Sequence, residues 1–333
     1  MRPHFEPKRR RVLPVDFPDC KLWLRSDLGI TLVADPVIGA WTLDAGWTNV
    51  GGGLYSHAGA VDHISQNILV IGNWYEITYT VSGVAGGTVQ PYAGATAGTS
   101  RAADGTYTET LLCAANVSLV FEGTGTVSVG AISCKSRSVS AWADQSGNGN
   151  HATQAVAAQQ PLLSTSGGPL GSPAIDYFLG SVHLRPPILN AGTSHTMFFA
   201  LNLRTPAPGA QRATLDASAG RLIAMPVDGG WLKLGYYDGA YKPTVVPIAG
   251  VQTNTFALDG VGGTGAVWRN GVSVGTPAYT AKALAGDVYL GGNSSAGVSS
   301  ADILLLEVAV WSRVLGADEL AILHAWSNAR YGL

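Results

Sequence analysis

Residues 75–81 alternate apolar and polar side chains in the order Tyr, Glu, Ile, Thr, Tyr, Thr and Val. Successive side chains of a β-strand point to opposite faces of a sheet, so this order places Tyr75, Ile77, Tyr79 and Val81 on one face. The pattern predicts a half-buried antiparallel strand.

Glycine separates further runs of the same kind. Residues 83–87 predict a turn, because glycine adopts the backbone angles that tight turns require. Strand-like runs follow at residues 88–92, 106–112, 117–121 and 126–133. Short strands at regular spacing with glycine between them are typical of a small sandwich or jelly roll.

A second series of strands is predicted in the C-terminal half, at residues 196–203, 231–236, 255–258 and 266–269. Asn270-Gly271 lies between two apolar runs and predicts a hairpin, because both central residues of a type I′ turn need positive φ. The nearly apolar residues 303–311 predict a central strand that is covered on both faces.

One helix is predicted at the C-terminal end. Asp318 and Glu319 are the acidic residues of its first turn, where they complement the helix dipole. Its apolar stripe and stop signals are Leu320, Leu323, Trp326, Arg330 and Gly332.

Composition agrees with an all-β protein. The 333 residues include 43 glycines and 17 prolines, and 46% of the side chains are hydrophobic, as expected for many short strands joined by turns. The length predicts two domains. A formal charge of −2 gives no broad basic surface, and no apolar run approaches the roughly 20 residues of a membrane span. We therefore expect no nucleic-acid partner and no membrane insertion.

Three cysteines, Cys20, Cys113 and Cys134, show no metal-ligand spacing. The N-terminal residues lack the apolar run of a signal peptide, so secretion by that route is not expected. An odd number of cysteines in such a chain favours reduced thiols. A disulfide between Cys113 and Cys134 is the alternative.

The first 18 residues combine prolines with a basic cluster, a composition that disfavours both helix and internal strand. We interpret them as an extended arm that orders along a partner protein, with a disordered terminus as the alternative. The anchoring residues would be Lys8, Arg9, Arg10 and Arg11.

Several motifs together resemble the laminin-G-like, concanavalin A-like lectin and glucanase superfamily as it occurs in phage and bacterial surface proteins. They are Leu-Trp-Leu-Arg-Ser at residues 22–26, Val-Ser-Ala-Trp-Ala-Asp-Gln-Ser-Gly-Asn-Gly-Asn-His-Ala at 139–152, the Asn-Gly hairpin, Val-Tyr-Leu-Gly-Gly at 288–292, and Glu-Val-Ala-Val-Trp at 307–311, followed by Asp-Glu at 318–319 and Tyr-Gly-Leu at 331–333. The resemblance implies a β-sandwich.

In family members the first two motifs lie close together, whereas here about 100 residues intervene, which implies an insertion. The sandwich would consist of residues 19–36 plus 137–333. Residues 37–136 would form a second, smaller β-sandwich, which resembles the carbohydrate-binding-module-like jelly rolls of phage tail proteins.

Glucanases of this superfamily carry their two carboxylates on one strand, as Glu-x-Asp-x-x-Glu or a close variant. The matching strand here, residues 303–311, contains one acid, Glu307. Glycoside hydrolysis ordinarily needs a carboxylate pair. We therefore expect no enzymatic activity and no catalytic residues, and we interpret Glu307 as a structural polar residue.

Asp144, Ser146, Asn148 and Gly149 stand at positions 1, 3, 5 and 6 of a loop that is similar to an EF-hand, so their oxygens are candidate calcium ligands. Ala155 occupies the position where that loop has its bidentate glutamate. The alternative is a turn in which the Asp and Asn side chains bond their own backbone. No other cofactor is expected.

Five aromatic residues of the inserted domain are candidate platforms for sugar rings, against the alternative that they are core residues. They are Trp41, Trp47, Tyr55, Trp74 and Tyr92.

The resemblance implies a bacteriophage virion protein, assembled in the host cytoplasm and displayed on the particle as a tail-associated fibre that binds host surface glycan. Its partners would be other virion proteins, and by analogy with fibres the expected oligomer is a homotrimer. Two alternatives are a capsid decoration or head fibre, and a free bacterial carbohydrate-binding protein or glycan hydrolase.

Overall fold

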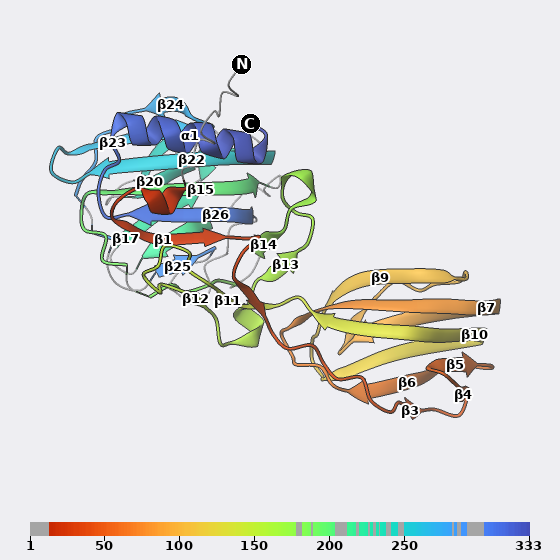
Figure 1. Cartoon of the computed structure of the whole chain (residues 1–333). Helices are drawn as coiled ribbons and strands as arrows, with labels where there is room; N and C mark the ends of the chain where they lie inside the picture. The colour runs from red at the N-terminus through yellow and green to blue at the C-terminus, as the bar shows by residue number, and fades with distance from the viewer. Residues whose placement is uncertain are drawn as a thin grey trace, which may run out of the picture. The chain divides into compact units, whose positions relative to one another are not determined.

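The computed structural model describes residues 13–333 except 178–181, 188, 204–211, 218–219, 226, 229–230, 233, 238–240, 246–249, 282, 285–287 and 292–302. For residue 203 and the described parts of 212–249 the description covers the backbone alone. The chain is an all-β protein of antiparallel, sandwich-like sheets with one C-terminal helix, as the sequence predicted (Figure 1). No described helix is long and apolar enough to cross a membrane.

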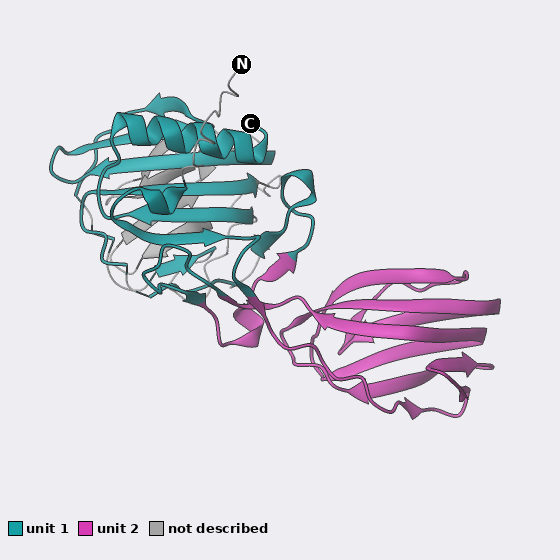
Figure 2. Cartoon of the chain, viewed as in Figure 1, with its two compact units in different colours: residues 1–30, 142–152, 164–333 teal, residues 31–141, 153–163 magenta. Residues whose placement is uncertain are grey.

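The chain divides into two compact units, and each unit is built from separate stretches of sequence (Figure 2). Unit 1 comprises Met1–Ile30, Trp142–Ala152 and Ser164–Leu333, and unit 2 comprises Thr31–Ala141 and Thr153–Leu163. These boundaries differ from the expected divisions after residues 36 and 136.

Backbone pairing explains the difference. β2 (Ile30–Leu32), β11 (Val139–Trp142) and β12 (Ala152–Thr153) form a three-stranded sheet. The Val139 amide also donates to the Pro161 carbonyl, at 2.8 Å. Backbone hydrogen bonds therefore connect residues that precede the expected insertion with residues that follow it.

Unit 2 is one eight-stranded antiparallel sheet in which β7 and β10 are the longest strands. Its strands are β3 (Thr42–Leu43), β4 (Trp47–Gly51), β5 (Leu54–His57), β6 (Asp62–Asn67), β7 (Trp74–Ala93), β8 (Thr96–Ala97), β9 (Gly105–Leu112) and β10 (Ser118–Ser136). A short 3-10 helix, Ala157–Gln159, also belongs to this unit.

The sheet of unit 2 folds over on itself around one core. The ring of Tyr79, in the first half of β7, lies 5.1 Å from the ring of Phe121. In the strand register, however, Phe121 pairs with Pro91 in the second half of β7. The contact between the two rings therefore crosses the sandwich.

The alternation at residues 75–81 is confirmed: the four predicted apolar side chains are buried. The turn predicted at residues 83–87 is wrong, because β7 continues through it. Gly83 and Gly86 have positive φ, and the pairing with β10 shifts register there. The glycines accommodate a β-bulge, which bends the strand without ending it.

Unit 1 contains most of a large sheet in the order β13-β14-β26-β15-β22-β23-β24, with β1 also paired to β26; the first two residues of β13 belong to unit 2. Its strands are β1 (Cys20–Arg25), β13 (Leu162–Ser164), β14 (Ala174–Tyr177), β15 (His195–Leu203), β22 (Gly250–Asp259), β23 (Thr264–Arg269), β24 (Val272–Gly275) and β26 (Ile303–Trp311). A five-stranded sheet contains β16 (Arg212–Ala217), β17 (Gly220–Met225), β20 (Leu234–Tyr237), β21 (Tyr241–Val245) and β25 (Val288–Leu290), and β18 (Val227–Asp228) pairs with β19 (Trp231–Leu232).

The predicted central strand is confirmed, since every residue of β26 is buried. The hairpin is also confirmed, with φ of 51° at Asn270 and 77° at Gly271 between β23 and β24. The helix α1 (Ala317–Tyr331) contacts β22 and ends at Gly332, which has the left-handed φ of 70°. Burial of Leu320, Leu323 and Trp326 agrees with the predicted apolar stripe.

The expected extended arm is wrong for its last residues. Pro14–Asp16 form a 3-10 helix, and Phe17 is buried in the core that also contains Trp311. The indole Nε1 of Trp311 donates to the Pro14 carbonyl at 3.3 Å. Apolar burial and this hydrogen bond join residues 14–17 to unit 1. A second short 3-10 helix of the unit spans Pro169–Gly171.

Candidate functional site

Polar side chains gather on the outer face of the layer that β6, β10 and the second half of β7 form in unit 2. Along β10 the side chains of Leu119 and Phe121 are buried, so those of Val120 and Glu122 point away from the core. Register places Val120 between Ser65 on β6 and Tyr92 on β7. Alternation and strand pairing thus assemble this face from three strands.

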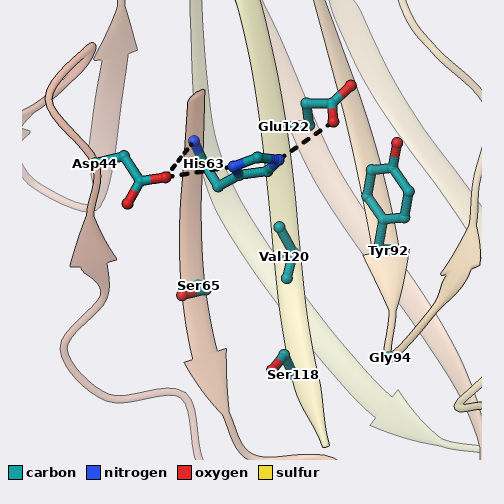
Figure 3. Close-up of a pocket in the computed structure, with 8 residues that line it drawn as sticks. All are labelled: Asp44, His63, Ser65, Tyr92, Gly94, Ser118, Val120 and Glu122. Carbon is teal, nitrogen blue, oxygen red and sulfur yellow. Dashed lines mark hydrogen bonds and ion pairs between the residues drawn. The ribbon is translucent and has the colours of Figure 1, made fainter. Parts of the chain in front are cut away.

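A pocket of about 420 Å³ lies on this face (Figure 3). It is lined by Asp44, His63, Ser65, Tyr92, Gly94, Ser118, Val120 and Glu122. Apart from Gly94, which has no side chain, and the apolar Val120, the lining residues are polar or amphipathic. The pocket therefore suits a ligand that is rich in hydrogen-bonding groups.

Three of these side chains form a row across the strands. Figure 3 shows the imidazole of His63 between two carboxylates. Its Nδ1 lies 3.3 Å from Asp44 Oδ2, and its Nε2 lies 3.2 Å from Glu122 Oε2. The backbone amides of Asp44 and His63 are also used, because Asp44 N donates to His63 O and His63 N donates to Asp44 Oδ2. The row is therefore fixed at several points.

Tyr92 supplies the aromatic side chain of the pocket. It is half-buried, and its hydroxyl donates to Gln90 Oε1 at 3.1 Å. Burial and then the neighbouring Glu122 carboxylate raise the pKa of Tyr92 above its ordinary value. The phenol therefore stays protonated at neutral pH and can donate a hydrogen bond.

Gly94 closes one end of the pocket. Its φ is +60°, and a Cβ added there would lie 2.1 Å from the Ala114 carbonyl oxygen. Both the backbone angle and the close approach require glycine.

Of the five aromatic residues predicted to bind sugar, the structure brings Tyr92 into the pocket. Trp47 and Tyr55 are 4% and 9% exposed and belong to the core of unit 2, so the prediction is wrong for both. The rings of these two residues face protein atoms. Trp41 is half-buried, packs edge-on to Tyr55 and Phe121 and lies outside the pocket lining, so its sugar-binding role stays a prediction. Trp74, half-buried at the start of β7, lies outside the pocket lining.

Sequence reasoning missed Asp44, His63, Ser65, Ser118 and Glu122. The alternation along residues 118–122 is a local signal that points Glu122 outward. The partner strand gives no comparable signal, since β6 buries Gln66, which exchanges hydrogen bonds with the Gly39 backbone.

The predicted calcium loop is held together by its own aspartate. Asp144 Oδ1 accepts from the amides of Trp23 and Ser146, and Oδ2 accepts from Ser146 Oγ and the Asn150 amide. Asn148 Nδ2 donates to the Cys20 carbonyl. The bonds of Asp144 are those of the alternative turn, whereas Asn148 bonds a distant strand and not its own backbone. Calcium stays a prediction. Within the described ranges no group of three or more His, Cys, Asp or Glu residues is arranged to hold a metal ion.

All three cysteines are free and buried, so the structure has no Cys113–Cys134 disulfide. Burial raises the pKa of Cys134 to about 12, and burial next to Asp144 raises that of Cys20 to about 12. The basic anchoring cluster, Lys8, Arg9, Arg10 and Arg11, lies outside the described residues.

Glu307 lies in a buried hydrogen-bond network in unit 1. It is 0% exposed and accepts hydrogen bonds from Trp23 Nε1 and Tyr331 Oη, with Arg330 Nε at 3.3 Å. Burial raises the pKa of Glu307, and these partners oppose that rise. Its contacts join β1, β26 and α1, which is the structural role that the sequence analysis assigned to it.

Comparison with known proteins identifies no family. No protein-family model matches the sequence, and no curated protein matches it. Similar solved structures include a sialidase from Trypanosoma rangeli, with 14% identity and a TM-score of 0.44 over 57% of this chain and 31% of that one. Domain 4 of AbnA, a GH43 extracellular arabinanase from Geobacillus stearothermophilus, has 15% identity and a TM-score of 0.40 over 55% of this chain and 92% of that one. The binding domain of Paraclostridial Mosquitocidal Protein 1 has 10% identity and a TM-score of 0.41 over 55% and 49% of the two chains.

This comparison corrects one expectation. The prediction that the chain is not an enzyme is contradicted, because a sialidase and an arabinanase are among the similar structures. At these identities and TM-scores the likeness assigns no substrate and no catalytic residue to this chain.

Proposed function

We propose that the protein binds carbohydrate through the pocket on the outer face of unit 2. The observation that carries this proposal is the half-buried ring of Tyr92 beside the row of Asp44, His63 and Glu122. A sugar presents an apolar C–H face together with several hydroxyls, and an aromatic side chain next to fixed polar groups complements both.

The chemistry of the pocket matches this ligand class. The carboxylates of Asp44 and Glu122 accept hydrogen bonds from hydroxyls, and the hydroxyls of Ser65 and Ser118 both donate and accept. Because the contacts of His63 hold the two carboxylates in place, little side-chain freedom remains to be lost on binding.

A glycan array probed with the labelled full-length chain tests the proposal. Tyr92→Ala is expected to weaken binding at least about tenfold, because the stacking surface is lost. Tyr92→Phe keeps the ring and is expected to retain most of the affinity. Thr108→Ala is the matched control, since Thr108 lies on β9, away from the pocket, and pairs with Thr78.

Retained binding in Tyr92→Ala would exclude this face as the binding surface. Absence of glycan binding by the unmodified chain would contradict the proposed function itself.

The setting that we propose is the surface of a bacteriophage particle, where the chain would be a tail-associated fibre protein that contacts host glycan. Support comes from the motifs that resemble laminin-G-like phage proteins, at residues 22–26, 139–152 and 307–311. Electron cryo-microscopy of particles that contain the chain tests this setting. Density projecting from the tail is expected, whereas density on the capsid lattice would assign the chain to the capsid.

A further inference from the structure

The charge of the pocket bears on which glycans can bind there. Its lining contains two carboxylates, Asp44 and Glu122, one imidazole, and no Lys or Arg. Two carboxylates and a neutral His63 give a net charge of −2, and protonation of His63 reduces it to −1. The pocket is therefore negative in either protonation state.

The rest of unit 2 does not compensate for this charge. Outside the pocket carboxylates, its two stretches of sequence contain five Asp and Glu residues against three Lys and Arg, a formal charge of −2, which brings the whole unit to −4. Two of the basic residues are paired away from the pocket, Arg137 with Glu76 at 2.6 Å and Arg101 with Glu109 at 3.9 Å. An approaching anion therefore meets a negative field from the whole unit.

We propose that this face binds neutral glycans and discriminates against glycans that carry a carboxylate or sulfate at the bound residue. This inference rests on the proposed function. Hydroxyls of a neutral sugar donate to Asp44 and Glu122, whereas an anionic group brings a like charge against the same oxygens. The repulsion between partly exposed charges is weakened by salt.

Matched pairs of glycans test the inference with the full-length chain: lactose against sialyllactose, and methyl-esterified polygalacturonan against polygalacturonate. For each pair in which binding is detected, the dissociation constant of the neutral glycan is expected to be at least about tenfold lower than that of the acidic glycan at about 20 mM salt. The ratio is expected to shrink at about 500 mM salt, because screening reduces the repulsion.

Charge-neutral variants connect the discrimination to the two carboxylates. Glu122→Gln and Asp44→Asn together are expected to reduce the neutral-to-acidic ratio at least about threefold. Asp104→Asn is the control, because it removes one exposed carboxylate elsewhere in unit 2, where Asp104 accepts a hydrogen bond from the Val84 amide. This variant is expected to leave the neutral-to-acidic ratio nearly unchanged.

Equal or tighter binding of the acidic members, lost in Tyr92→Ala, would overturn the inference and leave the proposed function standing. No binding to any of the four glycans by the unmodified chain would count against the proposed function and the inference together.

Discussion

Two glutamates on sheet strands, Glu307 in unit 1 and Glu122 in unit 2, both contact side-chain N–H or O–H groups but differ in their accessibility to solvent. Glu307 is fully buried and contacts the indole of Trp23, the phenol of Tyr331 and the guanidinium of Arg330. Glu122 contacts His63, and 25% of its side chain is exposed.

Burial, and not residue type, distinguishes the structural glutamate, Glu307, from the candidate binding glutamate, Glu122. The partners of Glu307 come from β1 and α1, so its carboxylate holds these elements together. His63 holds Glu122 in the lining of the pocket, where its partly exposed side chain is accessible to a ligand. Predictions about unit 1 therefore concern stability, and predictions about unit 2 concern affinity.

The largest effect is expected for Glu307→Ala. Removal of the carboxylate leaves Trp23 Nε1 and Tyr331 Oη without their buried acceptor, while Arg330 keeps Asp27 at 3.0 Å. The free energy of unfolding of unit 1 should therefore fall by about 3–5 kcal/mol. Urea unfolding monitored by tryptophan fluorescence measures the loss. Glu122→Gln is the matched control, with an expected change below about 0.5 kcal/mol. Equal losses of unfolding free energy in the two variants would contradict the structural role of Glu307.

A smaller effect on unit 1 is expected from acid. His195 is 0% exposed, and burial lowers its pKa to about 4 from the ordinary 6.5. The folded state therefore favours the neutral ring, whereas the unfolded chain takes up a proton as the pH falls below 6.5. The stabilisation is present above pH 6.5 and is lost towards pH 4, by about 3 kcal/mol in total.

Urea unfolding at pH 7 and at pH 4.5 measures this loss, and His195→Phe should reduce the pH dependence over that range. Burial also lowers the pKa of His324, so a residual dependence of the same sign is expected in the variant. An unchanged pH dependence in His195→Phe would contradict the assignment to His195.

The smallest effect is expected from reduction. Cys20 in unit 1 and Cys113 and Cys134 in unit 2 are buried thiols with raised pKa values. A thiol-specific reagent should modify them slowly in the folded protein at pH 8, and all three rapidly in urea, because the thiolate is the reactive form. A reducing agent should leave the unfolding midpoints of both units unchanged. A drop in the midpoint of unit 2 would indicate a disulfide.

Features set by local sequence were predictable. The alternation at residues 75–81, the Asn270-Gly271 turn and the apolar strand at residues 303–311 depend on neighbouring residues, and the structure confirms all three. The glycines at residues 83–87 were misassigned, because a bulge inside a bent strand uses the same residues as a turn.

Most of the candidate site depends on pairing between distant strands, which the sequence does not specify directly. His63 and Glu122 are 59 positions apart and meet through the register of β6 and β10. The same limitation applies to Trp47 and Tyr55, because composition alone does not distinguish a core aromatic residue from an exposed one.

The most direct test of the central claim is a crystal structure of the full-length chain with the neutral glycan that binds it most tightly. A sugar ring is expected against Tyr92, with its hydroxyls within hydrogen-bonding distance of Glu122 and Asp44. A glycan bound to unit 1, or on the face of unit 2 that carries Thr78 and Thr108, would contradict it.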